Sequence, residues 1–282
     1  MFDKEIKKLQ DKWSVLQDLE GLDIFVAGGA ITSIMTNKEI NDIDLYFKDE
    51  KAFTEFIGLW LSGDLGFLSV LSVTDKSITF LSTTEKVVIQ TIFYRWFEDA
   101  EDIFKDFDFT INMGAYSLKD KSIKLHEDFL KHNSQRYLSV NTGTAFPIIS
   151  ALRVDKYKKR GYTISKPQYF RILLPLVKLN INSWQEFKNH IGGMYGSKVE
   201  DLFDTSKDFS LEEALDQIDN NESEYSEEDP TVYDYEVLKV LLKKVTPKCK
   251  EVLEEYRGCI YSWRVGNKIM ESLGEDGSVL WK

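Results

Sequence analysis

Two glycines, followed thirteen residues later by a pair of aspartates, carry the clearest chemical signal in this 282-residue sequence. Gly28 and Gly29 end the apolar run LDIFVA, and the run AITSIM after them is predicted to begin a helix. Glycine allows backbone N–H groups to approach a ligand closely, and the start of a helix presents a positive dipole end. Phosphate is therefore the ligand expected at this turn.

The aspartates Asp42 and Asp44 lie in NDIDLYF, residues 41–47, where polar and apolar residues alternate as in a strand with one wet face. Alternate side chains of a strand point the same way, so the two carboxylates share a face while Ile43 and Leu45 enter the core. Adjacent carboxylates suit Mg²⁺ or Mn²⁺. A carboxylate pair that bridges two such ions is an arrangement that assists phosphoryl transfer.

Neither half of this pattern is specific by itself. A Gly-Gly pair usually marks only a turn, and exposed strand faces often carry acids. The ordered combination is more specific: a strand, Gly-Gly, a helix, and then Asp-x-Asp inside a second strand. The sequence therefore predicts a metal and phosphate site at residues 26–47.

The helices and strands expected around this site indicate that the chain has an α+β first part and a helical second part. We expect a head domain at residues 1–145 and a helical neck and body at 146–282, with an acidic segment at about 204–230. Apolar spacing predicts strands at 22–27, 41–47, 67–73, 77–83, 86–94, 108–118 and 122–128, and helices at 2–16, 51–61, 97–107, 147–160 and twice within 235–270.

Composition excludes several classes of protein. Eighteen Phe, thirteen Tyr and six Trp provide enough material for a core, so general disorder is excluded. No apolar run reaches the roughly 18–20 residues of a membrane span, and no membrane partner is expected. Two Cys and three scattered His argue against a disulfide framework or a zinc site. We expect a cytoplasmic location.

The net charge of −11 is unevenly distributed. Residues 200–236 hold fifteen acidic residues and one Lys, whereas residues 147–188 hold nine basic and two acidic residues, a net charge of +7. The basic segment 147–188 is therefore a candidate RNA-binding surface. The simpler interpretation is that both segments are ordinary solvated surface.

The glycine and aspartate blocks resemble those of polymerase-beta-type nucleotidyltransferases, most of all bacterial-type tRNA CCA-adding enzymes and poly(A) polymerases. The head of those enzymes opens with Gly-Gly-Ala and continues to an Asp-x-Asp-Leu strand, as in Gly28-Gly29-Ala30 and Asp42-Ile43-Asp44-Leu45 here. The block DFTINMGAY at 108–116 is similar to a second family motif. ALRVDKYKKRGYTI at 151–164 is similar to the neck helix.

The resemblance implies a nucleotidyltransferase-type mixed sheet with flanking helices, and a role for particular residues. Asp42 and Asp44 would hold Mg²⁺ or Mn²⁺ ions, and an NTP would be the substrate. The residues implied to contact the nucleotide are Gly28, Gly29 and Ser33 at the triphosphate, Asp108 and Asn112 at the sugar, and Arg153 of the neck. Asp108 is also a candidate catalytic acid.

The sequence departs from the family at several positions. Thr32 and Ser150 stand where the family has arginines, and the Glu-Asp-x-x-Arg block that selects C and then A is absent from residues 165–282. A third catalytic acid is also missing from its plausible position, which is Gln90, although Asp106 or Asp108 could replace it. These departures argue against true CCA addition.

Three hypotheses therefore compete. The first is an enzyme that moves NMP from an NTP to a hydroxyl of an RNA end, a small molecule or a protein. The second is a catalytically degenerate relative that serves as a nucleotide-binding or protein-interaction module, since a fold does not license an activity. The third, a nucleic-acid binder that acts through residues 147–188 without chemistry, does not account for Asp42 and Asp44.

Overall fold

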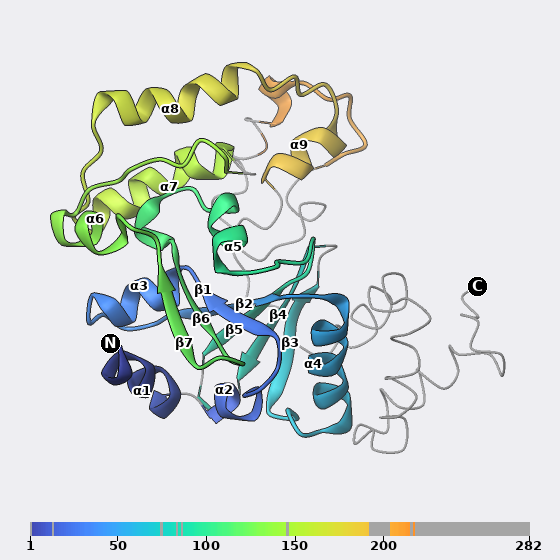
Figure 1. The fold of residues 1–282 in the computed structure, drawn as a ribbon. Helices are drawn as coiled ribbons and strands as arrows, with labels where there is room; N and C mark the ends of the chain where they lie inside the picture. The colour runs from blue at the N-terminus through green and yellow to red at the C-terminus, as the bar shows by residue number, and fades with distance from the viewer. Residues whose placement is uncertain are drawn as a thin grey trace. The chain divides into compact units, whose positions relative to one another are not determined.

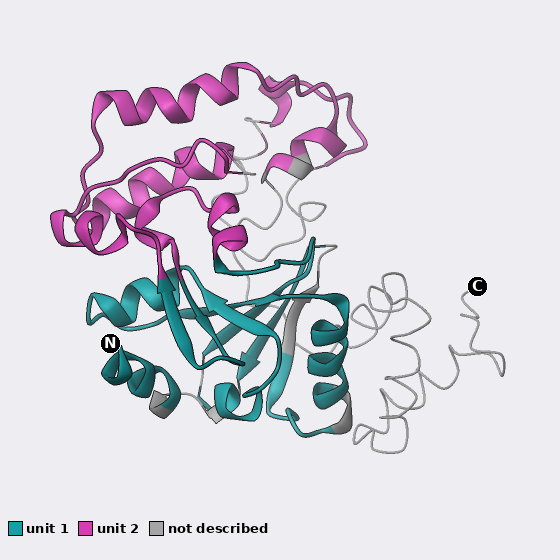
Figure 2. Cartoon of the chain, in the orientation of Figure 1, with its two compact units in different colours: residues 1–100, 115–124, 229–282 teal, residues 101–114, 125–228 magenta. Residues whose placement is uncertain are grey.

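The structure, a computed structural model, describes residues 2–12, 14–73, 76–82, 84–85, 87–144, 147–191, 204–214 and 217. These residues divide into two compact units (Figure 2). Of the described residues, unit 1 contains those within 1–100 and 115–124, and unit 2 contains those within 101–114 and 125–228. Unit 2 thus takes in part of the expected head as well as the expected neck. The two helices predicted within 235–270 lie outside the described residues.

Unit 1 is built on a seven-stranded mixed sheet in the order β3-β4-β5-β2-β1-β6-β7 (Figure 1). The central strand β2 pairs parallel with β5 and antiparallel with β1, which in turn pairs antiparallel with β6. The expected α+β class, a mixed sheet with flanking helices, is confirmed. The strands are β1 (Ile24–Ala27), β2 (Asp42–Phe47), β3 (Leu68–Val73), β4 (Ser77–Ser82), β5 (Val88–Ile92), β6 (Gly114–Ser117) and β7 (Ser122–Leu125).

Aromatic side chains fill the core between the sheet and a helix of unit 1. Phe56 of this helix, α4, stacks edge-on against Phe47 of β2 and Phe80 of β4, and Trp60 packs on Phe80 as well. Such pairs contribute about 0.5–1.5 kcal/mol each beyond the burial of their area. The helices of unit 1 are α1 (Asp3–Lys12), α2 (Ser14–Asp18), α3 (Gly29–Met35) and α4 (Glu50–Ser62).

Unit 2 is mainly helical. One of its clusters joins Phe109 to Val154 and Tyr157 of α7 and to Ile172 of α8. The helix α7 ends where Gly161 takes a positive φ of 86°, as its sequence position predicts. The helical elements are α5 (Ala100–Asp106), the 3₁₀ helix η1 (Thr110–Asn112), α6 (Phe129–Gln135), α7 (Pro147–Lys159), α8 (Lys166–Val177) and α9 (Trp184–Ile191).

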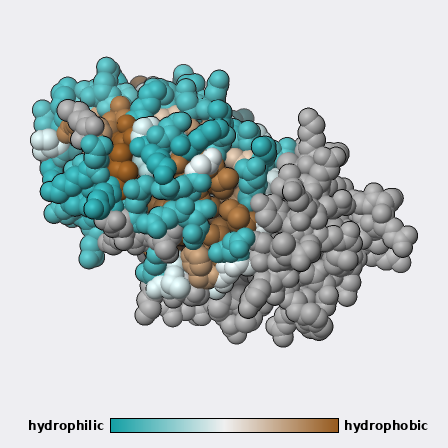
Figure 3. Space-filling model, turned by 60° about the horizontal axis from the view of Figure 1, so that its bottom comes forward, coloured by the Kyte–Doolittle hydropathy of each residue, from teal (hydrophilic) through white to brown (hydrophobic). Residues whose placement is uncertain are grey.

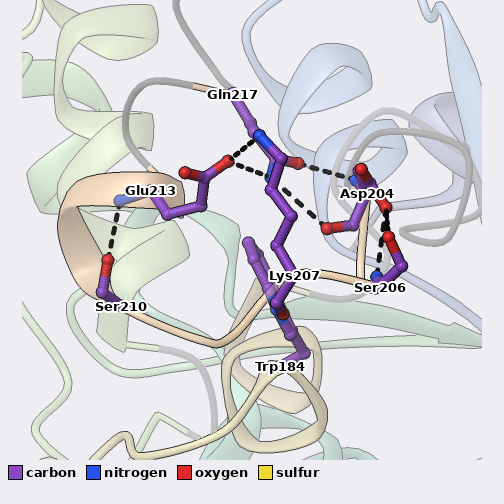
Figure 4. A network of polar contacts seen from close by, with 7 residues as sticks. All are labelled: Trp184, Asp204, Ser206, Lys207, Ser210, Glu213 and Gln217. Carbon is purple, nitrogen blue, oxygen red and sulfur yellow. Dashed lines mark hydrogen bonds and ion pairs between the residues drawn. The ribbon is translucent and has the colours of Figure 1, made fainter.

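Part of the acidic segment folds against α9 (Figure 4). The indole N–H of Trp184 donates to the backbone carbonyl of Lys207 at 2.8 Å, and Ala214 is buried with Trp184. Glu213 accepts hydrogen bonds from Lys207 Nζ at 2.7 Å and Gln217 Nε2 at 2.8 Å. The Lys207 hydrogen bond lowers the pKa of Glu213 below its usual value. The described residues of 204–217 are thus held locally on unit 2.

One predicted strand is wrong in its first half. Residues 108–118 were expected to be extended, but residues 110–112 form the turn η1 and only Gly114–Ser117 enter the sheet. The reason is local: Asn112 Nδ2 donates to Asp108 Oδ1 at 3.3 Å, which closes a turn across four residues. Alternation of apolar residues cannot reveal such a side-chain bond.

The visible surface in Figure 3 is largely hydrophilic, with hydrophobic residues gathered in a few places between polar ones. Within the described ranges, no helix is both long and apolar enough to cross a membrane. Large exposed apolar residues do occur, however, and most lie on the helices of unit 2: Leu130, Leu152, Phe170, Leu173, Leu174, Val177 and Leu211.

Candidate functional site

In unit 1, the register of β1 and β2 brings the glycines next to the aspartates. Ala27, the last residue of β1, pairs with Asp44 of β2, so the chain turns into Gly28 and Gly29 beside the start of β2. A Cβ placed on Gly29 would lie 3.8 Å from Asp42 Oδ1. The side of Gly29 that would carry a side chain therefore faces the first carboxylate.

The two carboxylates are accessible. Asp42 is exposed and Asp44 is half-buried, while Ile43 and Leu45 between and after them are fully buried. Both acids thus lie on one face of β2, as the alternation predicts, with the apolar residues on the other. An accessible carboxylate pair beside a glycine turn can bind a divalent cation together with a phosphate.

The turn itself is fixed by a backbone conformation and a buried hydroxyl. Gly28 has φ 81° and ψ −129°, a combination that residues with a Cβ rarely adopt. Thr32 is buried, and its Oγ1 donates to the Gly28 carbonyl at 3.1 Å. Thr32, which stands where the family that this sequence resembles has an arginine, thus stabilises the turn. Ser33, the candidate phosphate ligand, follows it in α3 and is half-buried.

We expect Gly28→Ala to weaken NTP binding as well as to lower stability, whereas a matched glycine substitution elsewhere should lower stability alone. The substitution forces a Cβ into a positive-φ conformation and should lower the free energy of unfolding by about 1–2 kcal/mol. Gly21→Ala is the matched control, because Gly21 has φ 89° and open space around its Cβ position. Thermal unfolding should show a similar loss in both variants, whereas only Gly28→Ala should weaken NTP binding. Equal NTP binding by the two variants would remove the turn from the site.

The position beside Asp44 on the neighbouring strand is occupied by an amide. Gln90 of β5 is the register partner of Asp44, and its Nε2 donates to Ser77 Oγ of β4 at 3.2 Å. No group of three or more His, Cys, Asp or Glu residues among the described positions could hold a metal. The two carboxylates of Asp42 and Asp44 would suit Mg²⁺, since this ion is often held by one or two carboxylates and substrate phosphates.

In unit 2, the structure brings Asp108, Asn112 and Arg153 together. Asp108 is 4% exposed in its side chain, and its Oδ2 accepts from Arg153 Nη1 at 3.3 Å, while its Oδ1 accepts from Asn112. Arg153 keeps 48% of its side chain exposed. A buried carboxylate therefore holds one edge of an arginine that reaches solvent. Ser150, where the family has another arginine, is buried one turn earlier in α7.

Two further residues complete this network, and the sequence did not single them out. Tyr157 OH donates to Asn112 Oδ1 at 2.9 Å, which fixes the orientation of the amide toward Asp108. Asn141 binds the backbone around Asp108: its N–H donates to the Asp108 carbonyl at 2.8 Å and its Nδ2 to the Phe107 carbonyl at 2.8 Å. The only signal for Tyr157 was its spacing of four residues from Arg153 in a predicted helix.

Burial, and to a lesser extent the nearby Asp108 carboxylate, raises the pKa of Tyr157 to about 12. In the unfolded chain this phenol ionises near its usual pKa of about 10. Its contribution to stability is therefore full below pH 10 and is lost as the pH rises toward 12. Unfolding measured from pH 8 to 12 should show a steeper loss in the wild type than in Tyr157→Phe, by up to about 2–3 kcal/mol. Parallel profiles would contradict the buried, neutral phenol.

Comparison with known proteins finds a family model that matches the N-terminal part of the chain. Residues 1–136 match the family model "Gad2: Gabija anti-defense 2 family protein". The protein "Gabija anti-defense 2" of Bacillus phage SPbetaL7 is 46% identical over 207 residues, which are 72% of this chain and 50% of that protein. The chain thus spans about half the length of this anti-defense relative.

Solved structures similar to this chain include CCA-adding and tRNA-processing enzymes. "The complex structure of CCA-adding enzyme with ATP" is 14% identical with a TM-score of 0.48, over 96% of this chain and 72% of that chain. "Thermotoga maritima CCA-adding enzyme complexed with tRNA_CCA" is 13% identical with a TM-score of 0.46, over 92% and 68%.

Proposed function

We propose that this chain is a metal-dependent nucleotidyltransferase that acts as an anti-defense protein. The observation that supports the activity best is the accessible pair Asp42 and Asp44 on β2, with the Gly28-Gly29 turn against Asp42. The anti-defense role follows the name of the phage relative, which is 46% identical over 207 residues. Transfer of NMP to an acceptor is then the means by which the defence is countered.

In this proposal Asp42 and Asp44 hold Mg²⁺ or Mn²⁺ together with the triphosphate of an NTP. When bound, the ion supplies a lowered pKa at the attacking hydroxyl and stabilises charge on the leaving pyrophosphate. The N–H groups of the turn and the Ser33 hydroxyl donate to phosphate oxygens. The Thr32 hydrogen bond to Gly28 keeps the turn in place, so that these donors need no rearrangement.

In unit 2, Asp108, Asn112 and Arg153 are proposed nucleotide contacts, in line with the family resemblance. The contacts of these three side chains support a different role for each. Asp108 is buried and already accepts two hydrogen bonds, so it orients the other two side chains. Arg153 presents its exposed guanidinium as a cation for an anionic or planar group. Asn112 is held by Tyr157 with its amide nitrogen toward Asp108.

The acceptor is proposed to be a component of the defended cell rather than the end of a tRNA. The sequence lacks the block that selects C and then A, and it has Thr32 and Ser150 in place of arginines. An RNA end, a small molecule and a protein hydroxyl all fit an NMP transfer. The basic segment 147–188, with its net charge of +7, favours an RNA among these.

A second candidate function is a non-catalytic interaction module. Gln90 favours it, because an amide stands beside Asp44 where many relatives place an acid. An anti-defense protein can also act by binding alone. This alternative predicts that the carboxylates of Asp42 and Asp44 are dispensable.

The experiment that tests the activity follows the α-phosphate. Each of the four NTPs, labelled at that phosphate, is incubated with the protein and Mg²⁺ in the presence of total RNA, a small-metabolite fraction and a protein fraction from the host cell. We expect one NTP to label one fraction, and chelation by EDTA to abolish the label. Absence of any labelled acceptor, together with absence of Mg²⁺-dependent NTP binding, would overturn the enzymatic function.

A further inference from the structure

Helix α8 carries apolar side chains on two faces, and only one of these faces is used inside the described fold. Tyr169, Ile172 and Leu176 pack against the cluster that contains Val154 and Tyr157 of α7. These three positions follow the i, i+3, i+7 spacing of one helical face. This contact accounts for the attachment of α8 to unit 2.

The other face, which we call the α8 stripe, consists of Phe170, Leu173, Leu174 and Val177. Their spacing of i, i+3, i+4 and i+7 places them side by side along about two turns. They are 60%, 47%, 61% and 82% exposed, respectively. The outward face of a surface helix is normally polar, so a continuous exposed stripe marks an interaction site rather than a packing detail.

The charged residues of α8 itself are all basic. Arg171 and Lys178 are exposed and, at a spacing of seven residues, lie on one side of α8 next to Leu174, while Lys166 opens the helix. None of these three cations forms a salt bridge within the described part of the chain. The sequence has no Asp or Glu between Asp155 and Glu186. The stripe is therefore an apolar centre with a cationic rim.

We propose that the α8 stripe binds an acidic segment of a protein partner that carries apolar side chains at helical spacing. An apolar centre with a polar rim is the anatomy of a protein interface, and anchors at i, i+3, i+4 and i+7 are those of helix-to-helix recognition. Opposite charge at the rim steers such a partner and fixes its register. The proposal goes beyond the nucleotidyl transfer and depends on neither residue of the Asp pair.

Two other occupants fit the same surface less well. RNA binding relies on cations at phosphates, and an RNA surface would place the cations, rather than four apolar side chains, at its centre. A second copy of this chain would bring two cationic rims together, and like charges across an interface are unfavourable. Charge complementarity thus selects an acidic protein segment.

The test uses the full chain and three fluorescent probes. The first probe is a synthetic 18-residue peptide with Leu at i, i+3, i+4 and i+7 and Glu at the flanking positions. The second is the same composition in scrambled order, and the third is a single-stranded RNA of similar length. Binding is measured by fluorescence anisotropy across a salt series, and the association state by sedimentation. The variants are Phe170→Ser/Leu174→Ser for the centre and Arg171→Glu/Lys178→Glu for the rim, with Leu130→Ser of α6 as the exposed apolar control.

We expect the ordered acidic peptide to bind at least about tenfold more tightly than the scrambled one. Phe170→Ser/Leu174→Ser should remove that difference at every salt concentration, whereas Arg171→Glu/Lys178→Glu should weaken binding mainly at low salt. Leu130→Ser should behave as the wild type, and all variants should unfold at the wild-type temperature. Three results would overturn the proposal: equal binding of both peptides, RNA binding that depends on Phe170 and Leu174, or a wild-type dimer that the same substitutions dissociate.

Discussion

The variant Asp42→Asn/Asp44→Asn is expected to lose Mg²⁺-dependent NTP binding by about 100-fold or more while it keeps its fold. Both side chains lie on the wet face of β2, with Asp42 exposed, so their amides should not disturb the buried Ile43 and Leu45. Binding of NTP at 100 times its Kd stabilises a protein by about 2.7 kcal/mol. Thermal unfolding with Mg²⁺ and NTP should therefore show an upward shift in the wild type that is absent in the variant.

The control for this prediction removes the same two charges elsewhere in unit 1. Asp3 and Asp18 are exposed in the N-terminal helices, so Asp3→Asn/Asp18→Asn changes net charge without touching β2. This control should keep the full ligand-induced shift. A shift that survives in Asp42→Asn/Asp44→Asn would show that the nucleotide binds elsewhere and would reject the carboxylate site.

The second large effect is an increase in metal affinity. Gln90→Asp should raise the affinity for Mg²⁺ or Mn²⁺ by about tenfold, because it adds a third carboxylate at the register partner of Asp44 and divalent affinity grows with ligand charge. Without metal, the new carboxylate repels Asp44, so the metal-free variant should melt below the wild type. Calorimetric titration with Mn²⁺ and thermal unfolding with and without the ion measure the two effects.

Ser77→Ala and Gln90→Leu distinguish the added charge from loss of the amide. Both remove the hydrogen bond between Gln90 Nε2 and Ser77 Oγ, and neither adds a carboxylate. Their metal affinity should stay near that of the wild type. If Gln90→Asp binds Mn²⁺ no better than Gln90→Leu, residue 90 does not face the metal.

The arrangement of the glycine turn and the two aspartates in unit 1 follows from local signals in the sequence. A strand that ends at Gly28, a helix after it, and polar residues at 42 and 44 on an alternating strand follow from turn chemistry and from the period of two. Antiparallel pairing of β1 with β2, in which Ala27 lies opposite Asp44, then brings the glycine turn next to the aspartates. Gln90, one of the positions considered for a third acid, is the register partner of Asp44 on β5.

The unit 2 network is predicted only in part, because its bonds link residues far apart in the chain. Arg153 and Tyr157 reach Asp108 and Asn112 across 45 residues, and no periodicity specifies such partners. The same holds for Asn141, whose amide spans 34 residues to the Phe107 carbonyl. The family motif names Asp108 and Asn112, but packing of α7 on η1 adds the tyrosine that orients them.

The apolar spacing of residues 166–177 does not show which face of α8 is covered. Both faces have the spacing of a core stripe, and only the contacts to α7 distinguish the buried Ile172 from the exposed Leu173 and Leu174. Burial is a property of the neighbours, which a single helix does not encode.

The most direct test of the central claim asks whether the chain has the proposed anti-defense effect and whether that effect depends on the carboxylates. Wild-type protein and Asp42→Asn/Asp44→Asn, expressed at equal soluble levels in cells that carry the Gabija defence, are compared for the efficiency with which a defence-sensitive phage forms plaques. The account predicts that the wild type restores plaque formation and the double variant does not. Full restoration by the folded double variant would contradict the enzymatic account and identify the chain as a binding module.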